Sequence, residues 1–154
     1  MHGALEDDRT GAGRVTTSFD HLAPGSELPP LARVVTREDV AAYAEAGGDH
    51  NPLHRDDDVA RAAGFPGIIA HGMFTMGHMA AGVVSWAGEE ATIERLSAQF
   101  RAPVFMGDEI VAGGRVRSVD PATRTAVVET WVTLQRDGKT EWPIRKGEAV
   151  VRFA

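Results

Sequence analysis

A stretch of sixteen residues in the middle of the chain, HGMFTMGHMAAGVVSW at 71–86, constrains the fold most strongly. Its apolar side chains are distributed around the whole helical circumference, and a helix that is apolar on all sides is expected to be buried. At about 1.5 Å per residue the segment is about 24 Å long, which is too short to span a bilayer. The segment therefore predicts a central helix that other elements of the same domain wrap.

The second half of the chain predicts the strands that surround this helix. Apolar and polar residues alternate with the period of half-buried β-strands over 109–117, 126–135 and 148–153. Residues 91–104 are expected to form another long strand, and DPATR at 120–124 and RDGK at 136–139 are typical of hairpin turns. We expect an α+β domain in which an antiparallel sheet wraps one long helix. Such a sheet leaves edges and one flank of the helix uncovered, so a partner subunit is expected.

Composition limits the class of protein. The chain has 154 residues, 43% of them hydrophobic, which fits one globular domain over 14–154 behind a flexible N-terminal tail over 1–13. The chain has no cysteine, which excludes disulfides and thiolate metal sites. The tail also lacks a signal-peptide pattern, so a cytoplasmic protein is expected. A net charge of -6 argues against nucleic acid as a partner, and no membrane segment is expected.

Two short helices are predicted on either side of a polar loop. Thr36 and Asp39 form a variant capping box, and the helix that follows is expected to stop at Gly47. The acidic residues at 56–58 stand where a helix through VARAAG would begin, and carboxylates there complement the positive end of the helix dipole. We interpret these three acidic residues as stabilising the start of a helix rather than as a binding site.

The loop between these helices, GGDHNPLH at 47–54, concentrates polar side chains. Asp49 and His54 are five residues apart with a proline between them, so a turn could aim both side chains into one cleft. An ionised carboxylate beside a neutral imidazole can hold one water from two sides, which suits the addition or removal of water. Asn51 could fix the backbone or the water.

The start of the apolar helix, AHGM at 70–73, offers a second kind of group. The first backbone N–H groups of a helix have no intrahelical acceptor and lie at the positive end of the dipole. Gly72 has no side chain to block approach to them. If a proton is removed next to a carbonyl, such donors can stabilise the enolate oxygen that develops.

Two ordered blocks, YAEAGGDHNPLH at 43–54 and IIAHGMFTMG at 68–77, resemble the signatures of the MaoC-like family of (R)-specific enoyl-thioester hydratases and 3-hydroxyacyl-thioester dehydratases. Within the family, the catalytic subunits of bacterial type II (3R)-hydroxyacyl-ACP dehydratases are most similar. The resemblance covers residues 33–154 and implies the hot-dog fold. It also implies a hydro-lyase that interconverts (3R)-hydroxyacyl and trans-2-enoyl thioesters of coenzyme A or acyl carrier protein, without a cofactor. The expected assembly is a homodimer, or a heterodimer with another hot-dog subunit.

The resemblance also assigns roles within the site. Asp49 and His54 become the catalytic pair, Asn51 a site-ordering residue, and Gly72 the backbone donor to the thioester carbonyl. His71, Met73 and Tyr43 are weaker candidates for contacts with the substrate, although packing roles are expected more often for such residues.

Other functions fit the same residues less well. A calcium loop is disfavoured because Leu53 and His54 stand where that pattern needs an oxygen ligand and a glycine. A zinc site from Asp49, His50 and His54 is also disfavoured, so no metal is expected. The remaining rivals are a hot-dog thioesterase, which would need a carboxylate near the helix start, and a non-catalytic acyl-binding subunit.

Overall fold

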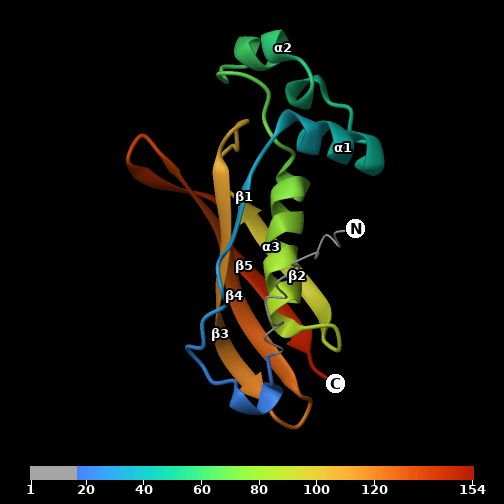
Figure 1. The fold of residues 1–154 in the computed structure, drawn as a ribbon, viewed down its shortest axis with the longest axis vertical. Helices are drawn as coiled ribbons and strands as arrows, with labels where there is room; N and C mark the ends of the chain where they lie inside the picture. The colour runs from blue at the N-terminus through green and yellow to red at the C-terminus, as the bar shows by residue number, and fades with distance from the viewer. Residues whose placement is uncertain (1–16) are drawn as a thin grey trace, which may run out of the picture.

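A single antiparallel sheet and one long helix make up most of the computed structural model, which describes residues 17–154 (Figure 1). The tail predicted over 1–13 lies outside the described residues. In chain order the elements are η1 (Phe19–His21), β1 (Leu31–Val34), α1 (Arg37–Gly47), η2 (Pro52–His54), α2 (Asp57–Ala62), α3 (Gly72–Ala87), β2 (Thr92–Phe100), β3 (Glu109–Asp120), β4 (Thr125–Arg136) and β5 (Lys139–Arg152).

The five strands are ordered β1-β3-β4-β5-β2, and every neighbouring pair is antiparallel. Both predicted hairpins are confirmed: β3 and β4 turn through Arg124 at φ 52°, and β4 and β5 turn through Asp137 and Gly138 at φ 52° and 72°. Register shifts interrupt the β3–β4, β4–β5 and β2–β5 ladders. Bulges of this kind bend a sheet, and here they help it to curl toward the helix.

The strand expected over 91–104 is shorter in the structure, where β2 is Thr92–Phe100. One further backbone bond runs from Arg101 N to the Pro143 carbonyl, at 2.9 Å. Pro103 has no N–H and cannot extend the ladder. The chain therefore leaves the sheet near Phe100, beside the start of α3.

Helix α3 lies along the concave side of the sheet and buries one face against it (Figure 1). The buried positions follow helical spacing and include Thr75, Met79, Val83 and Trp86. A side chain at Gly82 would come within 3.2 Å of the Ala112 Cβ, so the helix and β3 are in close contact there. On the opposite face Met73 is 55% exposed and Val84 is 53% exposed. The sheet therefore covers one flank of the helix and leaves the other uncovered within one chain, as the sequence predicts.

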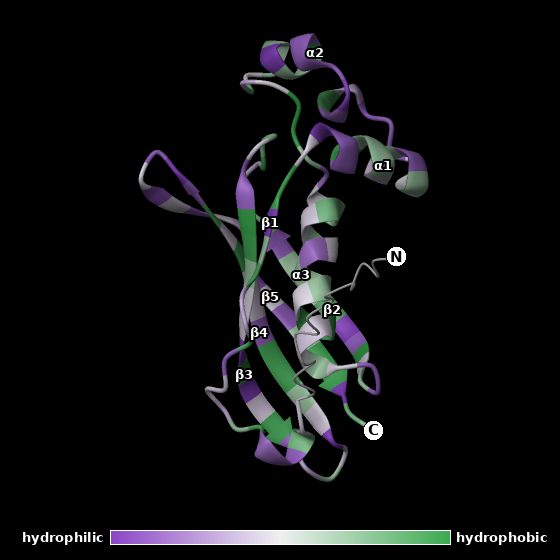
Figure 2. Cartoon of the chain, in the orientation of Figure 1, coloured by the Kyte–Doolittle hydropathy of each residue, from purple (hydrophilic) through white to green (hydrophobic). Residues whose placement is uncertain are grey.

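The remaining helices form a segment beyond the N-terminal end of α3, whereas η1 lies at the other end (Figure 1). The capping box of Thr36 and Asp39 is confirmed, and Asp56 caps α2 by accepting bonds from two backbone N–H groups. Figure 2 shows hydrophilic residues over much of α1 and α2, and hydrophobic residues along the strands that face α3. Within residues 17–154, no helix combines the length and the apolar character needed to cross a membrane.

Candidate active site

The polar loop is folded by bonds between its own side chains and backbone. Gly48 ends α1 with φ 68°, a left-handed conformation that favours glycine. The Asn51 N–H donates to Asp49 Oδ1 at 3.2 Å, and Asn51 Oδ1 accepts from the Leu53 N–H at 3.0 Å. Because Asn51 makes both bonds, it holds the turn between the two residues of the predicted pair.

His54 is oriented by the segment that precedes α3. Its Nδ1 lies 2.7 Å from the Ile69 carbonyl oxygen, and the Ile69 N–H donates to the Leu53 carbonyl at 3.1 Å. A carbonyl only accepts hydrogen bonds, so Nδ1 carries the hydrogen and the neutral ring presents an unprotonated Nε2. Nε2 is therefore the nitrogen that can take up a proton.

The structure brings the predicted pair together and adds a third residue. Ligand-type atoms of Asp49, His54 and His71 all lie within 4.8 Å of one another. Among these residues, Asp49 is exposed, His54 is half-buried and His71 is buried. A carboxylate and an imidazole are thus close enough to contact one water molecule between them.

The geometry of this cluster does not favour a metal ion. The rings of His54 and His71 are stacked, with centroids 3.8 Å apart and planes inclined by 26°. Ring-nitrogen lone pairs lie in the ring planes, so two nearly parallel rings do not aim them at a common point. Each ring also gives one nitrogen to a backbone carbonyl. The arrangement fits stacked, hydrogen-bonded rings better than metal ligands.

Gly72 is the first residue of α3 and lines a cavity of about 290 Å³ together with His54. The backbone N–H groups of Gly72 and Met73 have no carbonyl acceptor within the helix, because no helical turn precedes them. They lie at the positive end of the α3 dipole. A side chain at Gly72 would come within 3.3 Å of the Phe100 ring. The absence of a side chain therefore keeps this end of the helix accessible.

The three weaker candidates for contacts with the substrate, Met73, Tyr43 and His71, do not line this cavity. Met73 is exposed and, like Asp49, does not line this cavity. Tyr43 is half-buried, with its ring 4.8 Å from that of His71 and 5.9 Å from that of Phe74. His71 lies behind His54 and does not line the cavity either.

Part of the cavity wall comes from the block at 68–77, and the rest comes from segments that are distant in the sequence. Its remaining lining residues are Ile69, Ala70, Thr75, Phe100, Arg101, Ala102, Pro103, Val104 and Pro143. The β2–β5 pairing brings residues 100–104 and Pro143 beside α3. No local motif marks these positions, because they meet only through the fold of the sheet.

Asp57 has a larger role than helix-start chemistry. Its Oδ1 accepts from the Ile68 N–H at 2.9 Å, and its Oδ2 accepts from Arg37 at 2.7 Å. The bond from the Ile68 backbone and the one from Arg37 lower the pKa of the Asp57 carboxyl below its ordinary value of 3.8. Asp57 thus ties α1 and α2 to the segment whose Ile69 carbonyl orients His54.

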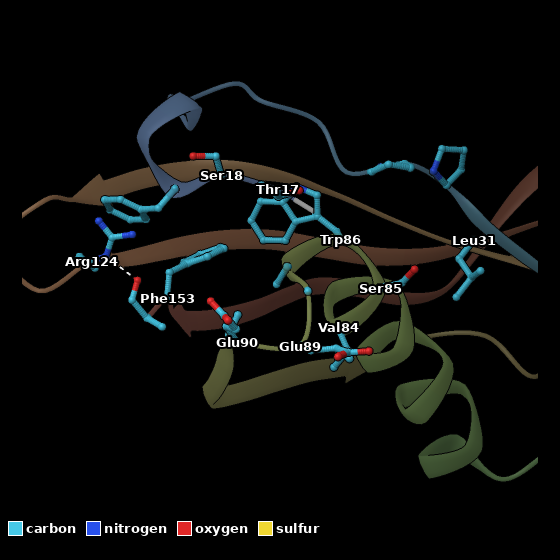
Figure 3. Close-up of a pocket in the computed structure, with 18 residues that line it drawn as sticks. Thr17, Ser18, Leu31, Val84, Ser85, Trp86, Glu89, Glu90, Arg124 and Phe153 are labelled. Carbon is cyan, nitrogen blue, oxygen red and sulfur yellow. Dashed lines mark hydrogen bonds between the residues drawn. The ribbon is translucent and has the colours of Figure 1, made fainter. Parts of the chain in front are cut away.

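A second, larger cavity of about 840 Å³ lies at the other end of α3 (Figure 3). Trp86, Phe153 and Phe19 contribute aromatic walls, with the rings of Trp86 and Phe153 edge to face at 5.8 Å. Arg124 stacks over Phe19 and donates from Nε to the Ala154 carbonyl at 2.8 Å. None of the residues predicted to be catalytic lines this cavity.

Known proteins agree with this architecture. Residues 22–138 match the profile of a family described as "MaoC like domain". The (R)-specific enoyl-CoA hydratase of Rhodospirillum rubrum is 31% identical over 134 residues, which are 86% of this chain and 89% of that protein. The mitochondrial 3-hydroxyacyl-[acyl-carrier-protein] dehydratase of Arabidopsis thaliana is 43% identical over 79 residues, 51% of this chain. This chain covers only 47% of the plant protein, so its similarity to that protein is partial.

Among solved structures, an (R)-hydratase from A. caviae involved in PHA biosynthesis superimposes with a TM-score of 0.77 at 28% identity. The match covers 87% of this chain and 98% of that one. The hot-dog fold expected from the sequence is therefore confirmed.

Proposed function

The chain belongs to the MaoC-like family, and from that premise we propose that it is a hydro-lyase acting on (3R)-hydroxyacyl and trans-2-enoyl thioesters. Relatives are named as 3-hydroxyacyl dehydratases and as an (R)-specific enoyl-CoA hydratase. The reaction adds water to, or removes it from, carbons 2 and 3 of an acyl chain. Coenzyme A and acyl carrier protein are both candidate carriers of the thioester.

The observation that carries this proposal is the placement of two kinds of group around one small cavity. His54 and Gly72 line the same cavity, and Asp49 lies close to His54. A proton acceptor and a backbone donor at a helix start are the groups that enolate chemistry needs. The alternative of a mere loop-ordering role for Asp49 and His54 does not account for the closeness of Asp49 to His54, or for the place of His54 in the cavity that Gly72 also lines.

In the hydration direction, Nε2 of His54 takes a proton from water while the water oxygen bonds to carbon 3. The electron pair of the carbon–carbon double bond moves toward carbon 2 and the carbonyl oxygen, which becomes an enolate. Carbon 2 then takes back the proton from His54, so the elements of one water are added. Asp49 accepts a hydrogen bond from the water, and the Gly72 amide donates to the enolate oxygen.

The magnitudes match the roles. One backbone donor aimed at a developing oxyanion contributes about 3 kcal/mol at the transition state. A positioned general base contributes about 10²- to 10⁴-fold in rate. Both contributions depend on the acyl carbonyl lying at the N-terminal end of α3, with carbon 3 facing Nε2 of His54.

We also propose that a second hot-dog subunit, identical or related, completes the molecule. β2 is the last strand of the sheet, so one of its edges is unpaired within the described chain, and Phe100 near its end is 50% exposed. Met73 and Val84, on the uncovered face of α3, are exposed as well. Sedimentation should therefore give twice the mass of one chain, or show assembly only with a related subunit.

A cytoplasmic location stays a prediction.

The test is to mix the purified protein with trans-2-butenoyl-CoA and follow loss of ultraviolet absorbance by the conjugated thioester. The expected product is (R)-3-hydroxybutyryl-CoA, identified by chiral chromatography after hydrolysis. Release of free coenzyme A without hydration would indicate a thioesterase instead. No turnover by the chain alone or with a related subunit, on coenzyme A or carrier-protein thioesters, would favour a non-catalytic acyl-binding role and overturn the proposal.

A further inference from the structure

His71 occupies a central place in the site without touching the cavity. It is the N-cap residue of α3, yet its side chain makes no capping bond to the helix. The side chain is only 2% exposed and lies between the ring of Tyr43 and that of His54. Its contacts connect α1, the polar loop and the start of α3.

One ring nitrogen of His71 holds the backbone of Asp49. Nε2 lies 3.1 Å from the Asp49 carbonyl oxygen, and since that oxygen only accepts, Nε2 carries the hydrogen. Asp49 is otherwise on an exposed turn, where its own Oδ1 accepts from Asn51. The His71 bond thus links the backbone of Asp49 directly to the buried start of α3.

The ring face of His71 supports His54. The two imidazoles stack at 3.8 Å, while the His54 edge is bonded to the Ile69 carbonyl. An edge bond alone leaves the ring free to tilt about that bond. A flat neighbour on one face removes this freedom and keeps Nε2 of His54 directed toward the cavity.

The second nitrogen of His71 makes simple packing a poor explanation. Nδ1 is buried and has no hydrogen-bond partner among the described residues. A buried polar atom without a partner destabilises the folded state, whereas a phenylalanine would fill similar space without that penalty. What histidine adds over phenylalanine is the N–H that reaches Asp49.

We propose that His71 is a positioning residue that sets Asp49 through a hydrogen bond and His54 through ring stacking. The inference rests on the proposed function for its effect on rate, but the geometry it describes can be measured without turnover. His71 touches neither water nor thioester in this account. It acts by keeping the carboxylate and the imidazole at the separation that one water requires.

Three substitutions separate the two contacts. His71→Phe keeps a flat ring and loses the N–H, His71→Gln keeps an N–H donor and loses the stack, and His71→Leu loses both. Each of the first two should lower kcat by about ten- to hundred-fold with less than about three-fold change in KM, since positioning is lost and binding is not. His71→Leu should lower kcat further.

His78 provides the matched control, because it is also buried on α3 and its Nε2 donates to a backbone carbonyl, that of Leu31 at 2.9 Å. His78→Phe should lower the melting temperature without lowering kcat. Coupling is tested by adding His71→Phe to Asp49→Asn: once the carboxylate is gone, the extra loss should be about two-fold or less. A full additional loss in the double variant would contradict action through Asp49.

Nuclear magnetic resonance of the histidine ring nitrogens supplies a readout that does not depend on activity. In the unsubstituted protein, hydrogen should reside on Nδ1 of His54 and on Nε2 of His71. His71→Leu should let the His54 ring tilt about its bond to the Ile69 carbonyl, which should shift and broaden the His54 ring-nitrogen signals while the hydrogen stays on Nδ1. If His71→Leu keeps full kcat, or leaves the His54 signals unchanged, the inference is overturned. If the unsubstituted protein hydrates no enoyl thioester, the proposed function fails, and the ring-nitrogen spectra alone then decide whether His71 positions His54.

Discussion

The cavities at the two ends of α3 differ in size and in the side chains that line them. At the N-terminal end, His54 and Gly72 line a cavity of about 290 Å³, and Asp49 is close by. At the C-terminal end, the cavity is about 840 Å³, with aromatic walls from Trp86 and Phe153 (Figure 3). The larger cavity is thus remote from the groups that can move a proton.

The direction of the helix explains why chemistry is expected only at the N-terminal end. Backbone amides there point out of the helix and favour negative charge, whereas carbonyls point out of the other end and disfavour it. Glu89 and Glu90 bring carboxylates to the C-terminal end, where Arg124 is a cation at the same cavity. A developing enolate oxygen would be stabilised at Gly72 and destabilised near Glu90, whatever the sizes of the two cavities.

The largest expected effect is at Asp49 and His54, the proposed catalytic pair. Asp49→Asn and His54→Gln should each lower kcat by about 10²- to 10⁴-fold, because each removes a group that we propose contacts the reacting water. Steady-state hydration of trans-2-butenoyl-CoA measures this. Asp58→Asn and His50→Gln are matched controls, since both side chains are exposed near the same loop. Equal losses in the controls would mean that the loop, rather than the pair, is being disturbed.

The opposite end of α3 should show the reverse pattern. Trp86→Ala removes a buried ring that packs against Phe153 and should lower the free energy of unfolding by about 3–5 kcal/mol. Denaturant titration measures the loss, and Trp86→Phe should show a smaller one if the alanine variant does not fold. Folded Trp86 variants should keep their kcat. A fall in kcat comparable to that of Asp49→Asn would place the reaction at the wrong end of the helix.

A side chain at the start of α3 should have an intermediate effect on activity. Gly72→Ala brings a methyl group within 3.3 Å of Phe100, at the place proposed for the thioester carbonyl. We expect kcat/KM to fall by about ten- to hundred-fold, within the contribution of one oxyanion donor. Gly77→Ala is the control, since nothing lies near its added methyl group and alanine raises helix stability by up to about 1 kcal/mol. If both variants keep full activity, Gly72 is not at the carbonyl.

The smallest effect concerns the middle of the helix, where burial lowers the pKa of His78 below its ordinary value of 6.5. Arg33 also lowers this pKa, and the bond to the Leu31 carbonyl raises it. In the unfolded chain His78 binds a proton near pH 6.5, whereas in the folded chain it binds one only at lower pH. The free energy of unfolding should therefore fall as the pH drops below that value. The slope from this one group is at most about 1.4 kcal/mol per pH unit.

Thermal unfolding between pH 7 and about pH 5 would show this effect, and His78→Gln should remove it. The carboxyls with lowered pKa, including Asp57 and Glu148, have ordinary values of 3.8 and 4.5, so their influence begins at lower pH. An unchanged slope in His78→Gln would assign the acid sensitivity to other groups.

Local signals in the sequence predicted the elements well. Capping chemistry at Thr36 and Asp56, the two hairpin turns and the apolar central helix correspond to elements of the structure. These features depend on residues within one or two turns of each other. The end of β2 was wrong by a few residues, because it depends on how Pro103 meets the neighbouring chain.

The site was predictable only in part, for a physical reason. Asp49 and His54 could be singled out because both belong to one short turn. The bond between Asp57 and Ile68, and the cavity wall at Pro143, join segments that are distant in sequence and meet only after folding. The stacking of His71 on His54 likewise follows from the meeting of the loop with α3.

The central claim is that the thioester carbonyl lies at the N-terminal end of α3, and a crystal structure of the Asp49→Asn variant with bound trans-2-butenoyl-CoA tests it most directly. The account predicts the carbonyl oxygen about 3 Å from the Gly72 amide nitrogen, with carbon 3 facing Nε2 of His54. An acyl group seated instead in the aromatic cavity beside Trp86, or a carbonyl directed away from Gly72, would contradict it.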